Sequence, residues 1–211
     1  MRALPDQGDA TRVVLVRHAE TEESARGHCY GRLDVRLSRQ GLRQAQALAA
    51  ALAGPPLAAV YTSPLSRTLD TARPIAATQG LEPAVIEALA ELDFGEVEGL
   101  RYDEIESQRP ELFRAWMDAP ASVRFPGGES LADLRSRVLP ALEQIRARHE
   151  REAVAIVAHG GVIRVVLADA LGLEDDALFR LDQAEGGVSG VDWLDGVPLV
   201  RVANATLYSP P

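Results

Sequence analysis

The chain of 211 residues contains no lysine, so arginine supplies all 22 of its basic side chains. The absence of lysine excludes a Walker-type phosphate site and any mechanism that forms a Schiff base on a lysine amine. A single cysteine, Cys29, excludes an intramolecular disulfide and fits a reducing compartment. We therefore expect a cytoplasmic protein without disulfide cross-links.

Long apolar runs are also missing. No stretch approaches the roughly 20 apolar residues of a membrane helix, and residues 1–10 show no signal-peptide pattern. Acidic residues outnumber basic ones by 31 to 22, which gives a formal net charge of −9 at pH 7. Such a charge disfavours nucleic acids and anionic membranes as partners, so any anion site must be a local positive cluster.

Short apolar runs alternate with amphipathic segments along the chain. Strands are predicted at 13–16, 58–61, 84–86, 154–157, 188–193 and 199–203, and helices at 38–53, 63–79, 131–149 and 162–171. Ser38 is placed to cap the first helix, which Gly54-Pro55-Pro56 stops, and Ser63-Pro64 opens the second. The alternation predicts a single α/β domain over 1–211, a three-layer α/β/α sandwich around a mostly parallel sheet.

Two segments fall outside this alternation. Residues 1–11 are interpreted as a loose lead-in, and residues of about 100–128 as a small helical insert that ends in a Pro/Gly-rich loop. The insert is expected to form a lid over a site, with simple edge decoration of the sheet as the alternative. Trp116 and Met117 either line this lid or pack inside the insert, and packing is favoured.

Groups suited to phosphate chemistry follow four predicted strands, at the edge where sites form in parallel sheets. They are Arg17 and His18 after the first strand, Arg67 after the second, Glu91 after the third, and His159 with Gly160 after the fourth. Two arginines can grip a phosphate dianion, and a neutral histidine can act as a nucleophile. A second histidine and helix-start amides can hold phosphoryl oxygens, while a glutamic acid can protonate a leaving alkoxide.

Several segments, in order along the chain, resemble the histidine phosphatase superfamily, also called phosphoglycerate-mutase-like. Arg17-His18-Ala19-Glu20-Thr21 is similar to its Arg-His-Gly-Glu-Thr signature, and similar segments follow at 33–45, 63–72, 89–99 and 158–161. The resemblance implies that His18 is phosphorylated, that Arg17, Arg67 and His159 bind the phosphoryl group, and that Glu91 donates the proton. It implies no metal and no other cofactor.

Some residues depart from the family pattern or allow two interpretations. Ala19 replaces the usual Gly, and Ser24 stands where many members have Asn. Thr21 and Ser24 either bind phosphoryl oxygens or cap a turn, and Tyr30-Gly31 either touches substrate or forms a plain turn. Without the other motifs, the alternative interpretation is that His18 is a buried core histidine and that His159 caps the start of a helix. His28 is expected in a loop rather than in a metal site, and His149 at an exposed helix end.

The resemblance leaves three functions open. A metal-independent phosphatase of a small phosphorylated metabolite is favoured over a phosphoglycerate mutase, because mutases of this type carry a longer insert. A catalytically silent phosphate-binding module is the third. Segments at 182–183, 187–189, 192–193 and 202–205 resemble α-ribazole phosphatases, so α-ribazole 5′-phosphate is one candidate substrate. The partner is thus a small metabolite, with a homodimer as an open option.

Overall fold

The computed structural model describes residues 7–54 and 56–207. Most of the expected lead-in, residues 1–6, and Pro55 of the expected helix stop lie outside these described residues. The first strand begins at Thr11, two residues before the expected start, and Ala10 beside it is fully buried. The prediction of a loose segment up to Thr11 is therefore wrong at its end, because the strand pairing already begins there.

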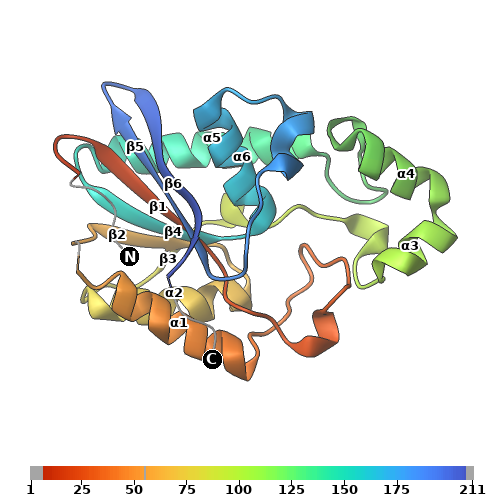
Figure 1. Cartoon of the computed structure of the whole chain (residues 1–211), viewed down its shortest axis with the longest axis horizontal. Helices are drawn as coiled ribbons and strands as arrows, with labels where there is room; N and C mark the ends of the chain where they lie inside the picture. Colours follow the sequence, from red (N-terminus) through yellow and green to blue (C-terminus); the bar gives the residue numbers. More distant parts are fainter. Residues whose placement is uncertain (1–6, 55, 208–211) are drawn as a thin grey trace.

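A six-stranded sheet forms the centre of the domain, with the strand order β3-β2-β4-β1-β5-β6 (Figure 1). The strands are β1 (Thr11–Arg17), β2 (Ala59–Thr62), β3 (Ala84–Val85), β4 (Ala153–Ala158), β5 (Gly187–Leu194) and β6 (Val197–Thr206). β1 to β4 run parallel to one another, β5 runs antiparallel to β1, and β6 pairs antiparallel with β5. The prediction of a mostly parallel sheet is confirmed.

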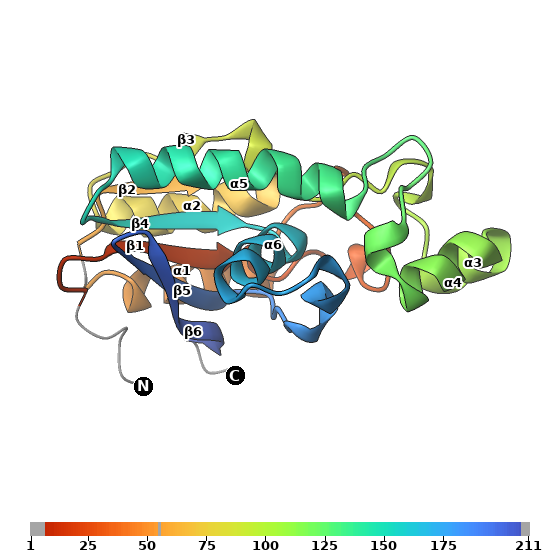
Figure 2. The same cartoon turned by 90° about the horizontal axis from the view of Figure 1, so that it is seen from above.

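Four long helices cover the two faces of this sheet, as Figures 1 and 2 show. α1 (Arg39–Ala51) and α2 (Ser66–Thr78) lie on one face, and α5 (Leu131–Arg148) and α6 (Gly160–Leu171) lie on the other. Side chains alternate between the two faces along a strand. Val14 and Val16 of β1 accordingly pack in the core cluster of α1 and α2, whereas Val13 and Leu15 pack in that of α5 and α6. The three-layer prediction is confirmed.

Local capping fixes where the helices begin. The Ser38 hydroxyl accepts a hydrogen bond from the Gly41 amide at 2.9 Å, which confirms Ser38 as the cap of α1. α2 begins at Ser66, so the prediction that Ser63 and Pro64 open it is wrong. The Ser63 hydroxyl instead lies buried, 2.7 Å from a ring nitrogen of His159. His149 caps the end of α5, but its ring is mostly buried against Tyr61, contrary to the exposed end expected.

The insert lies beyond the carboxyl end of the parallel strands, where Figure 2 shows α3 and α4 projecting from the sandwich. α3 (Tyr102–Gln108) and α4 (Pro110–Asp118) are short. The described residues also form five 3-10 turns: Glu23–Ala25 (η1), Glu87–Leu89 (η2), Gly95–Val97 (η3), Pro120–Ser122 (η4) and Asp175–Arg180 (η5). Trp116 packs edge-on against Phe125 and Phe179, with ring centres 4.9 and 5.1 Å away. Trp116 therefore packs as favoured and also lines a cavity at this end of the sheet, so both interpretations hold for it. Met117 is exposed, so the prediction that it packs inside the insert is wrong.

The only cysteine of the sequence, Cys29, is buried near the base of this insert. Burial, and next the nearby carboxylates of Glu98 and Glu91, raise the pKa of its thiol to about 12. The thiol is therefore protonated at neutral pH. Within residues 7–54 and 56–207, no helix is both long and apolar enough to cross a membrane.

Candidate active site

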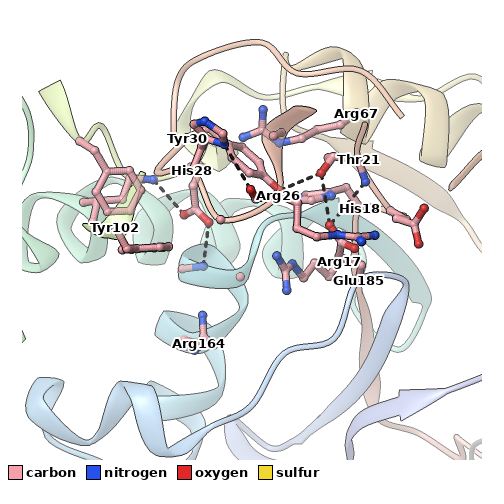
Figure 3. Close-up of a pocket in the computed structure, with 18 of the residues that line it drawn as sticks. Arg17, His18, Thr21, Arg26, His28, Tyr30, Arg67, Tyr102, Arg164 and Glu185 are labelled. Carbon is pink, nitrogen blue, oxygen red and sulfur yellow. Dashed lines mark hydrogen bonds between the residues drawn. The ribbon is translucent and has the colours of Figure 1, made fainter. Parts of the chain in front are cut away.

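The residues that follow the parallel strands converge on one cavity of about 340 Å³ at the carboxyl edge of the sheet (Figure 3). Arg17, His18, Arg67, Glu91 and Gly160 all line it. They come from positions up to 143 residues apart in the numbering, and the parallel arrangement of β1, β2 and β4 brings them together. Tyr102 and Trp116 of the insert also form part of its wall.

His18 extends the β1 backbone into this cavity, where its ring is almost fully buried. Its amide donates to the Ala158 carbonyl at 2.9 Å, and its carbonyl accepts from the Gly186 amide at 2.9 Å, which fixes the main chain. The ring nitrogen Nδ1 lies 2.9 Å from the Ala19 carbonyl oxygen. Because a carbonyl can only accept, Nδ1 carries the proton and Nε2 of the neutral ring keeps its lone pair.

The electrostatic surroundings keep this ring neutral. Burial, and then the positive charges of Arg17 and Arg67, hold the pKa of His18 well below its usual range. The hydrogen bond to Ala19 opposes this shift only in part. His18 is therefore an uncharged imidazole with a free nitrogen among guanidinium groups, which is the state that a nucleophile requires.

His159 lies directly beside His18, with 5.4 Å between the ring centres. It occupies the N-cap position of α6 without a side-chain capping hydrogen bond, and its Nε2 lies 2.7 Å from the Ser63 hydroxyl. Burial, followed by the charge of Arg67, lowers the pKa of His159 well below its usual range. Its Nδ1, together with Nε of Arg17 and Nε of Arg67, is buried without a hydrogen-bond partner among the described residues. Buried polar groups are usually hydrogen-bonded, so these three nitrogens are available to water or to a bound ligand.

Arg67 reaches the cavity from the first turn of α2 and holds the neighbouring loop in place. Its guanidinium donates to the carbonyls of Gly31 at 2.6 Å and Leu33 at 2.9 Å. It also lies over the Tyr30 ring, 5.2 Å from the ring centre (Figure 3). Arg17 is fixed in a similar way, since Nη1 donates to the Gln183 carbonyl. Both arginines therefore have their orientation set by main-chain carbonyls before any ligand binds.

Glu91 is held at the cavity by main-chain amides. Its carboxylate accepts hydrogen bonds from the amides of Gly161 and Leu92, both at 2.9 Å. Behind it, the Arg137 guanidinium donates to the carbonyls of Ala88, Ala90 and Glu91, at 2.8, 2.6 and 2.9 Å. These contacts fix the loop that presents the carboxyl group to the cavity.

The other predicted contact residues divide into two groups. Thr21 and Tyr30 line the cavity, and their hydroxyl oxygens are 2.9 Å apart. Ser24 lies in η1 and borders a neighbouring depression instead of the cavity. Gly31 is also outside the cavity wall, and a β-carbon there would lie 1.7 Å from the Leu92 carbonyl oxygen. Close packing at this position requires glycine, and the Gly31 carbonyl accepts a hydrogen bond from Arg67.

Sequence reasoning missed several residues at this site. Glu129 pairs with Arg137 at 2.8 Å and accepts from the Asp93 amide, so it supports the Glu91 loop from behind. Glu185 and Arg164 line the cavity, and Glu185 accepts from the Thr21 amide at 3.4 Å. No local pattern pointed to Glu129, Arg137 or Glu185. Arg164 had a usable signal, because it follows Gly160 by four residues on the same helix face.

The fold and the site define an α/β protein with an anion cavity built around a buried, neutral histidine. Residues 13–206 match the family model described as "Histidine phosphatase superfamily (branch 1)". The chain belongs to this family, as its motifs indicated.

Several relatives of this chain are named phosphatases. It is 39% identical over 163 residues, 77% of each chain, to "Phosphoserine phosphatase 1" of Hydrogenobacter thermophilus. It is 40% identical over 164 residues to "Metal-independent phosphoserine phosphatase" of Arabidopsis thaliana, covering 76% of this chain and 68% of the relative. It spans only 56% of the longer "Bifunctional protein Rv2228c" of Mycobacterium tuberculosis, at 37% identity over 96% of its own length.

Solved structures show the same fold. A putative alpha-ribazole-5′-P phosphatase from Escherichia coli superimposes with a TM-score of 0.86 at 25% identity, over 96% of this chain and 100% of that one. The comparisons thus support the expectation of a phosphatase enzyme. They do not single out one substrate.

Proposed function

We propose that this chain is a metal-independent phosphomonoesterase that hydrolyses a small phosphorylated metabolite through a phosphohistidine at His18. The observation that carries this proposal is the contact of 2.9 Å between His18 Nδ1 and the Ala19 carbonyl oxygen. His18 Nδ1 donates to the Ala19 carbonyl, so Nε2 keeps a lone pair inside a cavity lined by Arg17 and Arg67.

In the first step, His18 Nε2 attacks the phosphorus atom while the bond from phosphorus to the ester oxygen breaks. Arg17, Arg67 and His159 bind the phosphoryl oxygens and neutralise their charge as the transition state forms. The step starts from the protonated form of Glu91, which gives its proton to the departing oxygen, so the alcohol leaves neutral. The products of this step are the free alcohol and an enzyme with a phosphorus–nitrogen bond.

In the second step, water attacks the phosphohistidine. Glu91, now ionised, accepts a proton from this water, and the bond from phosphorus to nitrogen breaks. Inorganic phosphate leaves and His18 returns to its neutral form, so atoms and charges balance over the cycle. Guanidinium and imidazole groups supply the positive charge throughout, and the proposed steps use no metal ion.

Similarity ranks the candidate substrates. Relatives that are 39% and 40% identical are named phosphoserine phosphatases, which favours phosphoserine or a close analogue. α-Ribazole 5′-phosphate, suggested by the C-terminal segments, is supported by the fold of a neighbour at 25% identity. The phosphoglycerate mutase alternative ranks below phosphoserine, because two of the relatives above are named phosphoserine phosphatases, but a 40% identical relative of Arabidopsis thaliana is named "Phosphoglycerate mutase-like protein 4".

The test is to trap the phosphoenzyme. Wild-type protein is mixed with a ³²P-labelled small ester in the presence of a metal chelator and quenched within milliseconds. We expect label that is stable in alkali and lost in acid, together with steady release of phosphate. His18→Ala should acquire no label, and His149→Ala, which changes a histidine at the other end of the sheet, should label normally.

Two outcomes contradict the proposal. Wild-type protein that binds the ester but neither acquires label nor releases phosphate would be a binding module. Interconversion of 2- and 3-phosphoglycerate far faster than phosphate release would identify a mutase.

A further inference from the structure

Arg164 is a positively charged side chain in the cavity wall that takes no part in the two proposed steps. It lies on α6 one turn after Gly160, and Figure 3 shows it on the α6 side of the cavity. Its Nε donates to the Leu181 carbonyl at 2.9 Å, and its guanidinium carbon lies 5.3 Å from the centre of the Phe179 ring. No carboxylate within residues 7–54 and 56–207 forms an ion pair with it.

A second guanidinium approaches the same place. A β-carbon built on Gly160 would lie 3.0 Å from Nη1 of Arg164 and 3.7 Å from Nε of Arg17. The two positive groups therefore meet above one glycine without an acidic side chain paired to Arg164. Burial, and next the charge of Arg17, lower the pKa of Arg164, and the negative charges of Glu91 and Asp182 oppose this shift. An anion at this point would relieve the repulsion.

The position of Glu91 shows which part of a substrate Arg164 can reach. The Glu91 carboxylate accepts from the Gly161 amide, one residue after the glycine that Arg164 approaches. A proton donor must lie beside the ester oxygen. Arg164 therefore lies between Arg17, which is assigned to the phosphoryl group, and the part of the wall formed by Phe179 and Trp116, where the alcohol portion would lie.

We propose that Arg164 binds a carboxylate on the alcohol portion of the substrate, so that the cavity selects phosphate monoesters of small hydroxy acids. This inference rests on the proposed function and assigns its selectivity to one side chain. The forked donors of a guanidinium match the two oxygens of a carboxylate. A cavity of about 340 Å³ is at the small end for ligand sites, which suits a short ester.

The test uses two esters that differ only in this group. O-phosphoserine has the carboxylate, and phosphoethanolamine is the same molecule without it. We expect wild-type kcat/KM to favour phosphoserine by about 10-fold or more, as for loss of a hydrogen bond to a charged group. Arg164→Gln should lower kcat/KM for phosphoserine about 10- to 100-fold and leave phosphoethanolamine within about threefold.

Two further variants make the result specific. Arg180→Gln removes the same charge from an exposed position in η5 outside the cavity wall and should change neither substrate. Arg164→Lys keeps the positive charge but lacks the paired donors of a guanidinium. It should therefore lower the preference for phosphoserine by a smaller factor than Arg164→Gln does. It also provides the measurement if Arg164→Gln does not fold, as judged by its circular dichroism.

The outcomes separate this inference from the proposed function. If wild-type protein hydrolyses both esters equally well, or if Arg164→Gln slows both by the same factor, the carboxylate assignment is wrong while the phosphatase function stands. If neither these esters nor p-nitrophenyl phosphate is hydrolysed, the proposed function fails and the inference fails with it.

Discussion

The carboxylate of Glu91 occupies the space that a side chain on Gly161 would need, since a β-carbon there would lie 2.4 Å from Glu91 Oε1. The same carboxylate accepts a hydrogen bond from the Gly161 amide at 2.9 Å. Glycine at this position therefore allows the proposed acid to rest against the start of α6. The identity of one residue thus sets the position of another that lies 70 positions earlier.

We expect Gly161→Ala to push Glu91 away from the ester oxygen. Hydrolysis of an alkyl phosphate should fall about 10- to 100-fold, because general acid catalysis depends on close placement of the proton donor. Hydrolysis of p-nitrophenyl phosphate, whose leaving group needs little protonation, should fall less than about threefold. Gly54→Ala is the matched control, since a β-carbon at Gly54 meets no atom within 4 Å. Equal slowing of both esters would show that Glu91 is not the acid.

The proposed nucleophile gives a direct spectroscopic prediction. In ¹⁵N-detected NMR of the free protein at pH 6, His18 should show a neutral ring protonated at Nδ1, because that nitrogen donates to the Ala19 carbonyl. Burial and the charges of Arg17 and Arg67 lower the pKa of His18, so this ring should stay neutral when the pH falls below the usual pKa of a histidine. A proton on Nε2 at pH 6 would remove the lone pair that the mechanism needs.

The same two buried histidines predict how stability depends on pH. The unfolded chain binds protons at His18 and His159 below about pH 6.5, whereas the folded chain, with both pKa values lowered, does not. The contribution of these two neutral rings to the free energy of unfolding is thus fully present above about pH 6.5. It is lost as the pH falls from there toward the folded pKa values, by at most about 1.4 kcal/mol per pH unit for each ring.

Urea unfolding at pH 7.5 and pH 5.5 checks this dependence. The free energy of unfolding should be lower at pH 5.5, and the difference should shrink in a His18→Asn/His159→Asn variant. A variant with the unchanged pH dependence of the wild type would contradict the assignment of the effect to these rings.

Arg137 and Glu129 form the support of the acid loop, and their loss should affect both folding and catalysis. Glu129 accepts from the Asp93 amide, and although burial opposes it, hydrogen bonds from Arg137 and Asp93 lower its pKa. We expect Arg137→Met to lower the free energy of unfolding by about 2 kcal/mol, because it removes the guanidinium that pairs with the partly buried Glu129 and donates to three carbonyls. It should also slow alkyl phosphates more than p-nitrophenyl phosphate. Unfolding curves and leaving-group dependence measure the two effects, and loss of stability alone would limit Arg137 to a structural role.

A buried ion cluster far from the cavity should affect stability without changing chemistry. Asp192 on β5 is fully buried and pairs with Arg12 at 2.6 Å and Arg201 at 2.8 Å. Asp192→Asn removes the negative charge that pairs with the buried Arg12, so the free energy of unfolding should fall by about 3 kcal/mol. The kcat/KM for a small ester at 25 °C should stay within about twofold. A large loss of activity in a variant that is still folded would show that this end of the sheet is coupled to the cavity.

The sequence predicted what depends on local pattern. β1, β2 and β4 are short, largely apolar runs, and the parallel-sheet rule then predicts Arg17, His18, Arg67 and His159 at one edge. Helix starts were less certain, because the Ser63 hydroxyl bonds to His159 rather than capping α2, and that contact spans 96 positions. The roles of Glu129, Arg137 and Glu185 at the site could not be predicted for the same reason, since only tertiary packing brings these residues to it.

Cys29 has a consequence for how this protein responds to oxidative stress. The reacting atom in the proposed mechanism is a nitrogen, and the one thiol of the chain is buried with its pKa raised to about 12. Peroxide and alkylating reagents attack the thiolate and not the thiol. Hydrolysis should therefore continue at peroxide concentrations that inactivate enzymes with an exposed, ionised cysteine.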